Sequence, residues 1–128
     1  MSEWTSDELK RVGGAEEVQI TSRRRDGTLR NPVTVWVARD GDSLYLRSVQ
    51  GPSGAWFRAA EESHEGRIRA GGIEKDITFV DPGRDLDEKV DAAYRAKYKR
   101  YAGSILNSIL TPQARSATVK LVPRSGRS

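Results

Sequence analysis

The sequence predicts a mainly β fold with helices (α+β), namely an antiparallel six-stranded split β-barrel with flanking helices. Short apolar runs alternate with period two and are separated by Asp-Gly and Gly-Gly pairs, which are typical hairpin turns. Helical patterns occur only between these runs and toward the ends. Closing six short strands into a barrel would remove exposed sheet edges. With 128 residues we expect one domain over 1–128, comprising an N-terminal helical segment over 1–14 and a loose tail over 124–128.

The first helix is expected to begin near Ser6, with Thr5 or Ser6 as its N-cap and acidic residues in its first turn. The glycine pair 13–14 ends it. Trp4, which directly precedes the cap, is expected to fasten this helix to the barrel.

Three strands between residues 18 and 47 form a predicted meander. A two-residue loop at Asp26-Gly27 pairs Arg25 with Thr28, Arg23 with Arg30, Ile20 with Val33 and Val18 with Val35. The second turn is a two-residue loop at 40–41 or 41–42, and both choices keep the same face inward. A three-residue loop would turn the third strand over.

The two faces of this meander differ in chemistry. The face expected to form the core is aliphatic: Val18, Ile20, Val33, Val35, Val37, Leu44 and Leu46. The other face is polar, basic and aromatic: Gln19, Thr21, Arg23, Arg30, Pro32, Thr34, Trp36, Tyr45 and Arg47. Arg23 opposite Arg30 is unfavourable unless an anion lies between them, and guanidinium groups suit phosphate and carboxylate. The alternative is a solvated basic strand, and Trp36 is expected to pack under a helix rather than on a ligand.

The middle of the chain predicts a helix and a second hairpin. The helix starts at Ser53 or Gly54 and runs through Trp56 to about Glu62. Strands over 66–70 and 73–80 follow, joined by a Gly-Gly turn or interrupted there by a bulge.

The C-terminal third predicts two helices and a closing strand. Asp85 caps a long helix that reaches about Ala102, and its apolar side recurs at three- and four-residue spacing. Its three tyrosines pack on the barrel with their hydroxyls at the rim, or alternatively wall a ligand cleft beside Arg95 and Lys97; we favour packing. A short helix over 104–110 ends at Thr111, and a strand over 117–122 closes the fold.

Composition excludes several classes of function. The absence of cysteine removes disulfides, thiolate catalysis and cysteine-ligated zinc, and no metal site is expected. His64, the single histidine, lies in a polar segment and is expected to be solvated. A net charge of +4 permits nucleic-acid binding without implying it, and the basic residues alternate across both faces, so this function ranks last. No apolar run approaches the ~20 residues of a membrane span. No signal peptide is expected, so we expect a cytoplasmic protein.

The order of the motifs resembles a known superfamily. The runs Ile20-Thr21, Asp26-Gly27, PVTVWV over 32–37, DGD over 40–42 and LYLRS over 44–48 resemble the opening of FMN-binding split barrels. That superfamily includes pyridoxamine phosphate oxidase-like proteins and deazaflavin-dependent nitroreductases. The run GPSGAWFR over 51–58 is similar to the nitroreductases' loop into a Trp-containing helix, and DAAYRAKY over 91–98 is similar to a small bacterial family near them. The resemblance covers about residues 15 to 123.

The resemblance implies an FMN or deazaflavin cofactor. Its phosphate would lie near the end of the third strand and the next loop, with its ring along the first strands. The site residues carried over are Arg47, Ser48, Ser53 and Trp56 for the phosphate, Arg23 and Arg30 as further charges, and Thr34 and Trp36 for the ring. FMN-binding members usually have a basic residue where this chain has Ala55, so a deazaflavin coenzyme, haem or no cofactor stay open as alternatives to FMN. The resemblance also implies a homodimer.

Two functions follow as hypotheses. The first is a flavin- or deazaflavin-binding oxidoreductase in which the cofactor does the chemistry. The second is a non-catalytic module that binds a small anionic ligand or a partner and has lost the cofactor. The sequence assigns no catalytic residue to either one.

Overall fold

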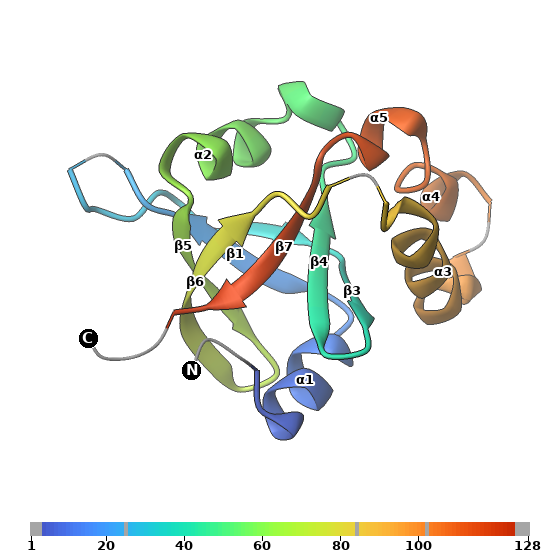
Figure 1. The fold of residues 1–128 in the computed structure, drawn as a ribbon, viewed down its shortest axis with the longest axis horizontal. Helices are drawn as coiled ribbons and strands as arrows, with labels where there is room; N and C mark the ends of the chain where they lie inside the picture. The colour runs from blue at the N-terminus through green and yellow to red at the C-terminus, as the bar shows by residue number, and fades with distance from the viewer. Residues whose placement is uncertain (1–3, 25, 84, 102, 125–128) are drawn as a thin grey trace.

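The computed structural model describes residues 4–24, 26–83, 85–101 and 103–124 (Figure 1). The strands are β1 (Val18–Ser22), β2 (Val33–Val35), β3 (Val37–Asp40), β4 (Ser43–Arg47), β5 (Glu65–Ala70), β6 (Ile73–Val80) and β7 (Thr118–Pro123). The helices are α1 (Ser6–Gly13), η1 (Gly51–Ser53), α2 (Ala55–Ser63), α3 (Asp87–Lys97), η2 (Lys99–Tyr101), α4 (Ser104–Asn107) and α5 (Pro112–Arg115).

The strands form one antiparallel sheet in the order β2-β1-β5-β6-β7-β4-β3. The two ends of this order, β2 and β3, are separated in the chain by Trp36 alone, so the sheet curls into a nearly closed barrel with helices around it (Figure 1). The predicted α+β split barrel is therefore confirmed. The prediction of six strands misses one, because Trp36 divides the expected second strand into β2, which pairs with β1, and β3, which pairs with β4.

The first hairpin keeps part of its predicted register. Ile20 pairs with Val33 and Val18 with Val35, as expected. Arg23, however, bridges Leu29 rather than Arg30. Between the two paired positions, three residues lie on the second strand and two on the first. The second strand thus has one extra residue and bulges there. The predicted pairing of Arg25 with Thr28 lies outside the described residues.

The remaining turns follow the predictions closely. The second hairpin loop is Gly41-Asp42, since Asp40 pairs with Ser43. The Gly-Gly pair connects β5 to β6 with both glycines at positive φ, 57° and 83°. Helix α1 starts after Thr5, which forms a capping box with Glu8. Helix α2 covers the predicted segment with Gly54 as its N-cap.

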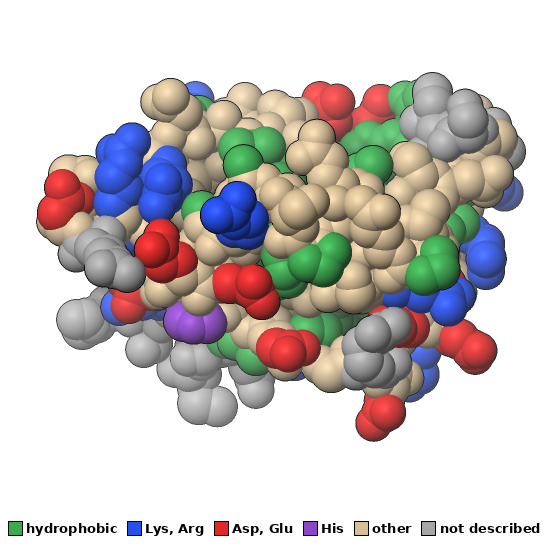
Figure 2. Space-filling model, turned by 90° about the horizontal axis from the view of Figure 1, so that it is seen from above, with side chains coloured by type: hydrophobic (Ala, Val, Ile, Leu, Met, Phe, Trp, Pro, Cys, Tyr) green, Lys and Arg blue, Asp and Glu red, His purple; other side chains and the backbone are tan. Residues whose placement is uncertain are grey.

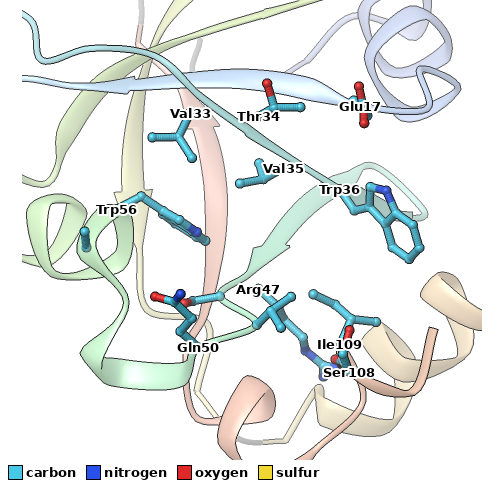
Figure 3. A pocket seen from close by; sticks show the side chains of 13 residues that line it. Glu17, Val33, Thr34, Val35, Trp36, Arg47, Gln50, Trp56, Ser108 and Ile109 are labelled. Carbon is cyan, nitrogen blue, oxygen red and sulfur yellow. Dashed lines mark hydrogen bonds between the residues drawn. The ribbon is translucent and has the colours of Figure 1, made fainter. Parts of the chain in front are cut away.

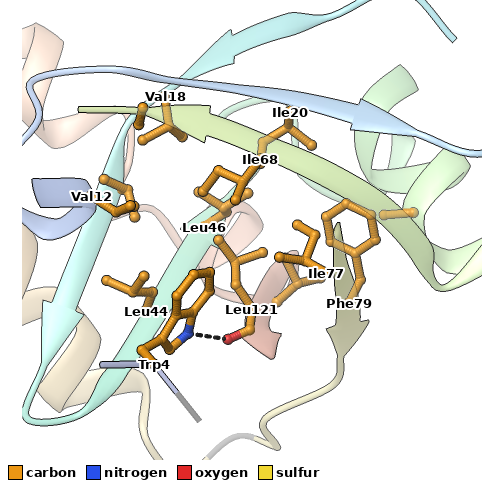
Figure 4. Packing of buried hydrophobic residues seen from close by; sticks show 14 of the residues in the cluster. Trp4, Val12, Val18, Ile20, Leu44, Leu46, Ile68, Ile77, Phe79 and Leu121 are labelled. Carbon is orange, nitrogen blue, oxygen red and sulfur yellow. Dashed lines mark hydrogen bonds between the residues drawn. The ribbon is translucent and has the colours of Figure 1, made fainter. Parts of the chain in front are cut away.

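The barrel interior holds the main core (Figure 4). Five of the seven predicted aliphatic side chains are fully buried there: Val18, Ile20, Val37, Leu44 and Leu46. Val35 is partly buried, but Val33 is 38% exposed and does not belong to the core, because β2 is the last strand of the sheet and pairs only with β1. Trp4 fastens the N-terminus as expected, with its indole Nε1 donating to the Leu121 carbonyl at 3.0 Å.

A second cluster lies outside the barrel, under α3. Its buried members are Ala38, Tyr45, Val90, Tyr94, Tyr98, Leu106 and Ile109. Helix α3 is shorter than predicted: it follows Leu86 with no side-chain cap from Asp85, and a 3-10 turn replaces its last part. The predicted end at Ala102 lies outside the described residues, as do 125–128 of the predicted tail.

The segment after α3 also differs in detail. Helix α4 ends at Asn107, three residues earlier than predicted. Thr111 does not end a helix but caps α5, because its hydroxyl accepts a hydrogen bond from the Ala114 amide at 3.0 Å. Proline at the first helical position suits such a start, since it has no amide proton to satisfy.

The tyrosines of α3 cover the backbone exposed by the strand division. The Tyr94 hydroxyl donates to the Trp36 carbonyl at 3.1 Å. The Val37 amide donates to the Tyr98 hydroxyl at 3.3 Å, and Lys97 Nζ donates to the Val37 carbonyl at 2.9 Å. Packing of the tyrosines is thus confirmed, but Tyr94 and Tyr98 are buried and their hydroxyls are not at the rim. These side chains replace a missing strand at the edge of β3.

Candidate functional site

A cleft of about 550 Å³ opens where β2 separates from the end of β4 (Figure 3). It exists because β4 pairs with β3 and not with β2, so the two sides of the barrel diverge past Trp36. Its lining residues are Glu17, Val33, Thr34, Val35, Trp36, Arg47, Ser48, Val49, Gln50, Ala55, Trp56, Ser108 and Ile109.

The cleft is bounded mainly by apolar side chains. Val33 and Val35 extend from β2 into it, while Thr34 extends to the opposite side of the strand (Figure 3). Trp36 and Trp56 lie on opposite sides of this space. Val33 is 38% exposed, so it offers apolar surface to a ligand rather than to the core. An open apolar space with few polar groups is typical of a small-molecule site.

The two indoles are held by different supports. The Trp36 ring stacks on the Tyr98 ring, with 3.9 Å between centroids and 3° between planes. Tyr101 packs against Trp36 as well, at 5.3 Å. Trp56 meets Phe57 edge to face at 6.1 Å. Tyr98 and Tyr101 do not line the cleft; they hold in place the ring of Trp36, which does.

The loop between β4 and α2 shapes the lower rim. Ser48 is buried, and a Cβ at Gly54 would lie 2.3 Å from its hydroxyl oxygen. Only glycine permits this approach, which places the start of α2, and hence Trp56, against the end of β4. The Gln50 carbonyl accepts from the Ser53 hydroxyl at 3.3 Å and from the Gln113 amide. The Gln50 side chain itself lines the cleft.

Arg47 contributes its stem to the cleft but directs its charge elsewhere. Its Nε donates to the Thr118 hydroxyl at 3.0 Å. One terminal nitrogen donates to an Asp91 carboxylate oxygen and to the Ile109 carbonyl, and the other donates to the Asp87 carbonyl at 3.0 Å. The side chain is buried, and its donors are engaged by these internal partners. Four of the five guanidinium donors are thus used internally, and the charge of Arg47 is balanced by Asp91 rather than directed at a phosphate in the cleft.

Asp91 is the centre of this buried charge cluster. It accepts hydrogen bonds from Arg47 and from Arg115. Burial opposes ionisation of Asp91, but the hydrogen bonds from the two guanidinium groups outweigh burial and hold its pKa below the ordinary value of 3.8. The cluster joins β4, α3 and α5, and so it fixes the side of the cleft formed by Ser108 and Ile109.

The structure brings five of the eight predicted site residues together around the cleft: Thr34, Trp36, Arg47, Ser48 and Trp56. Ser53 is exposed in the adjoining turn and does not line it. Arg23 lies apart: its guanidinium donates to the Gly27 carbonyl at 2.8 Å and lies 3.8 Å from Glu65. The expected anion between Arg23 and Arg30 therefore has no support, since the two are not paired.

Arg30 lines a second hollow of about 270 Å³ on the far side of Trp56. This hollow lies between the β1–β2 hairpin and α2, and it shares Val33, Ala55 and Trp56 with the cleft. Seen from above α2, hydrophobic side chains are exposed near the middle of the face, and basic side chains gather at the end that holds the hairpin (Figure 2).

Several lining residues were not predicted. Val49 and Gln50 lie in the loop after β4. Val49 is 50% exposed, and the only sequence signal for this is an apolar residue outside any strand pattern. Ser108 and Ile109 reach the cleft through tertiary packing, for which the sequence has no local signal. Within the described ranges, no group of three or more metal-binding side chains occurs, and no helix has both the length and the apolar character of a membrane span.

Comparisons with known proteins agree with this architecture. The profile of a family described as "Uncharacterized protein conserved in bacteria (DUF2255)" matches residues 8–121. A search of curated proteins finds no match.

Solved structures share the fold at low sequence identity. An F420 reductase has 18% identity and a TM-score of 0.54, over 91% of this chain and 90% of that one. A conserved hypothetical protein from Mycobacterium tuberculosis has 10% identity and a TM-score of 0.58, over 98% and 83%. An FAD-binding protein from Mesorhizobium loti has 15% identity and a TM-score of 0.53, over 94% and 88%.

Proposed function

The chain belongs to the bacterial family DUF2255, and from this premise and its fold we propose that it binds a flavin-type cofactor, FMN or a deazaflavin, as part of a reductase. The observation that carries the proposal is the cleft with an indole on each side and valines between them. Proteins of the same fold include an F420 reductase and an FAD-binding protein. At their low identity these likenesses support the fold, and the cleft must support the function.

The residues present fit the ring system of such a cofactor. In the cleft of about 550 Å³, Val33, Val35 and the two indoles would hold the flat faces of such a ring. The side chain of Gln50 lies at the border of this space and offers a donor and an acceptor to a polar ring edge. When bound, the cofactor would supply the electron-transfer chemistry, and the chain would bind it, orient it and exclude water.

Binding of flavins to the purified protein tests the proposal directly. We expect FMN or a deazaflavin to bind with a dissociation constant below about 10 μM, measured by calorimetry and by the shift of the visible spectrum. Val33→Trp should abolish binding because it fills the cleft from an exposed position. Val80→Trp is the matched control, since Val80 is a strand valine with 37% exposure that does not line the cleft. No binding of either cofactor to the unmodified protein would refute the proposal.

A second candidate is a non-catalytic small-ligand module. It is favoured by the charges of the cleft: among its lining residues, Glu17 and Arg47 are the only charged side chains, and Arg47 is engaged internally. Since this module would have lost the cofactor, flavin binding followed by reduction separates the two. Binding of a flavin whose visible absorbance is bleached by a nicotinamide reductant supports a reductase, whereas thermal stabilisation by small anions without flavin binding supports the module.

The homodimer implied by the resemblance stays a prediction. Sedimentation of the purified chain tests it, and a mass near twice the 14.2 kDa of one chain is expected.

A further inference from the structure

The cleft and the second hollow adjoin each other at Trp56. They share Val33, Ala55 and Trp56 as lining residues, so one extended molecule that reaches around this indole could contact both. The hollow is lined by Ile20, Ser22, Arg24, Arg30, Asn31, Val33, Ala55, Trp56 and Ala59. It lies between the hairpin and α2, where Arg30 donates to Glu62 of α2 at 3.2 Å.

The charge of the hollow differs from that of the cleft. Two arginines and no acidic residue line it. Arg24 donates to neutral oxygens, the Thr28 hydroxyl at 3.4 Å and the Leu29 carbonyl at 3.1 Å. Asp26 in the hairpin turn interacts with it electrostatically, but no carboxylate hydrogen-bonds to Arg24 within the described residues.

Arg30 is only partly satisfied. One of its terminal nitrogens contacts Glu62 on α2 at 3.2 Å. Its Nε is buried and, within the described residues, has no hydrogen-bond partner. A buried donor without a partner is costly in free energy, and an acceptor brought by a ligand would remove that cost.

We propose that this hollow binds a phosphate group through Arg24 and Arg30, and that this phosphate belongs to the molecule whose planar part occupies the cleft. The second clause rests on the proposed function. Two guanidinium groups match the charge and the fork geometry of a phosphate dianion. The phosphate is thus assigned to Arg24 and Arg30, on the other side of Trp56, and not to Arg47, whose charge is paired with Asp91.

Comparing FMN with riboflavin tests the assignment, because these two molecules differ by the phosphate. In the unmodified protein at low salt, FMN should bind at least tenfold more tightly than riboflavin, measured by calorimetry. Arg24→Gln combined with Arg30→Gln should reduce the affinity for FMN to that for riboflavin and leave riboflavin unchanged. Arg69→Gln combined with Arg95→Gln is the matched control, because it removes the same charge from two exposed arginines outside the hollow. A preference for FMN that survives the first double substitution, or no preference in the unmodified protein, would overturn the proposal.

Inorganic phosphate separates this proposal from the function of the cleft. If neither flavin binds, the proposed function fails, but millimolar phosphate should still raise the melting temperature of the unmodified protein and not that of the Arg24→Gln, Arg30→Gln variant. Glu62→Gln should strengthen phosphate binding severalfold, because it removes the carboxylate that competes for Arg30. Equal effects of phosphate on the unmodified protein and the double variant would refute the anion site itself.

Discussion

At the residue scale, Arg47 shows what a strand pattern can and cannot predict. Alternation correctly placed Arg47 on the outer face of β4 with Tyr45, opposite the core side chain Leu46. The same pattern has no information about what covers that face. Helix α3 covers it, and Asp91 on α3 takes the charge that we had expected to meet a phosphate. The identity of a partner 44 residues away depends on tertiary packing, which no local pattern reports.

Replacing Arg47 with methionine should lower the free energy of unfolding by about 3–5 kcal/mol, because it removes one partner of a buried ion pair and leaves a carboxylate under-compensated. Urea denaturation measures this change. Arg95→Met on the exposed side of α3 serves as the control and should stay within about 0.5 kcal/mol of the unmodified protein. A similar small effect at Arg47 would contradict the structural role assigned to it.

At the element scale, the division of one predicted strand into β2 and β3 creates both the cleft and the need for α3. Because β2 pairs with β1 and β3 pairs with β4, β2 diverges from the end of β4, and the cleft opens there. Sequence analysis predicted the strands, the turns and the tyrosine stripe, since these depend on local spacing. It missed the division at Trp36, because PVTVWV alternates without interruption and only the curvature of the barrel separates its halves. It also missed Ser108 and Ile109, which follow a four-residue helix with little periodic signal.

Replacing Tyr98 with phenylalanine should cost about 1–3 kcal/mol of unfolding free energy, because it leaves the Val37 amide and the Glu16 carbonyl without the hydroxyl that serves both. Hydrogen exchange at the Val37 amide should accelerate in the same variant. Tyr101→Phe is the comparison, because the Tyr101 hydroxyl contacts the exposed side chain of Glu16 and its loss should cost less. Equal stability of the two variants would argue against the edge-covering role of α3.

At the scale of the whole molecule, the barrel is predictable from the sequence, whereas the packing of its side chains is predictable only in part. Short alternating strands, tight turns and a terminal strand are enough to predict closure, and the interior core follows from the same alternation, with Val33 as the exception. The second cluster under α3 is not predictable in the same way, since it combines one face of a sheet with a helix held by long-range contacts of Asp91 and the tyrosines. The candidate site sits where these two packed layers separate.

The global stability should decrease in acid. The pKa of Asp91 is lower in the folded protein than its ordinary value of 3.8, so the unfolded chain binds more protons at low pH. The contribution of Asp91 to the unfolding free energy is therefore complete above about pH 5 and is lost as the pH falls through its folded pKa. Denaturation curves between pH 2 and 6, roughly the accessible range, should show a flatter dependence for Asp91→Asn, whereas Asp42→Asn at an exposed turn should retain the slope of the unmodified protein. Parallel slopes for both variants would show that other carboxylates dominate.

The placement of the three tryptophans gives the molecule a built-in optical reporter. Trp4 is buried at the end of the barrel and hydrogen-bonded to β7, whereas Trp36 and Trp56 border the cleft. A chromophore seated between the latter two would quench their emission and leave that of Trp4 as a residual blue-shifted band. Intrinsic fluorescence can thus distinguish occupancy of the cleft from binding anywhere else on the surface, without any label.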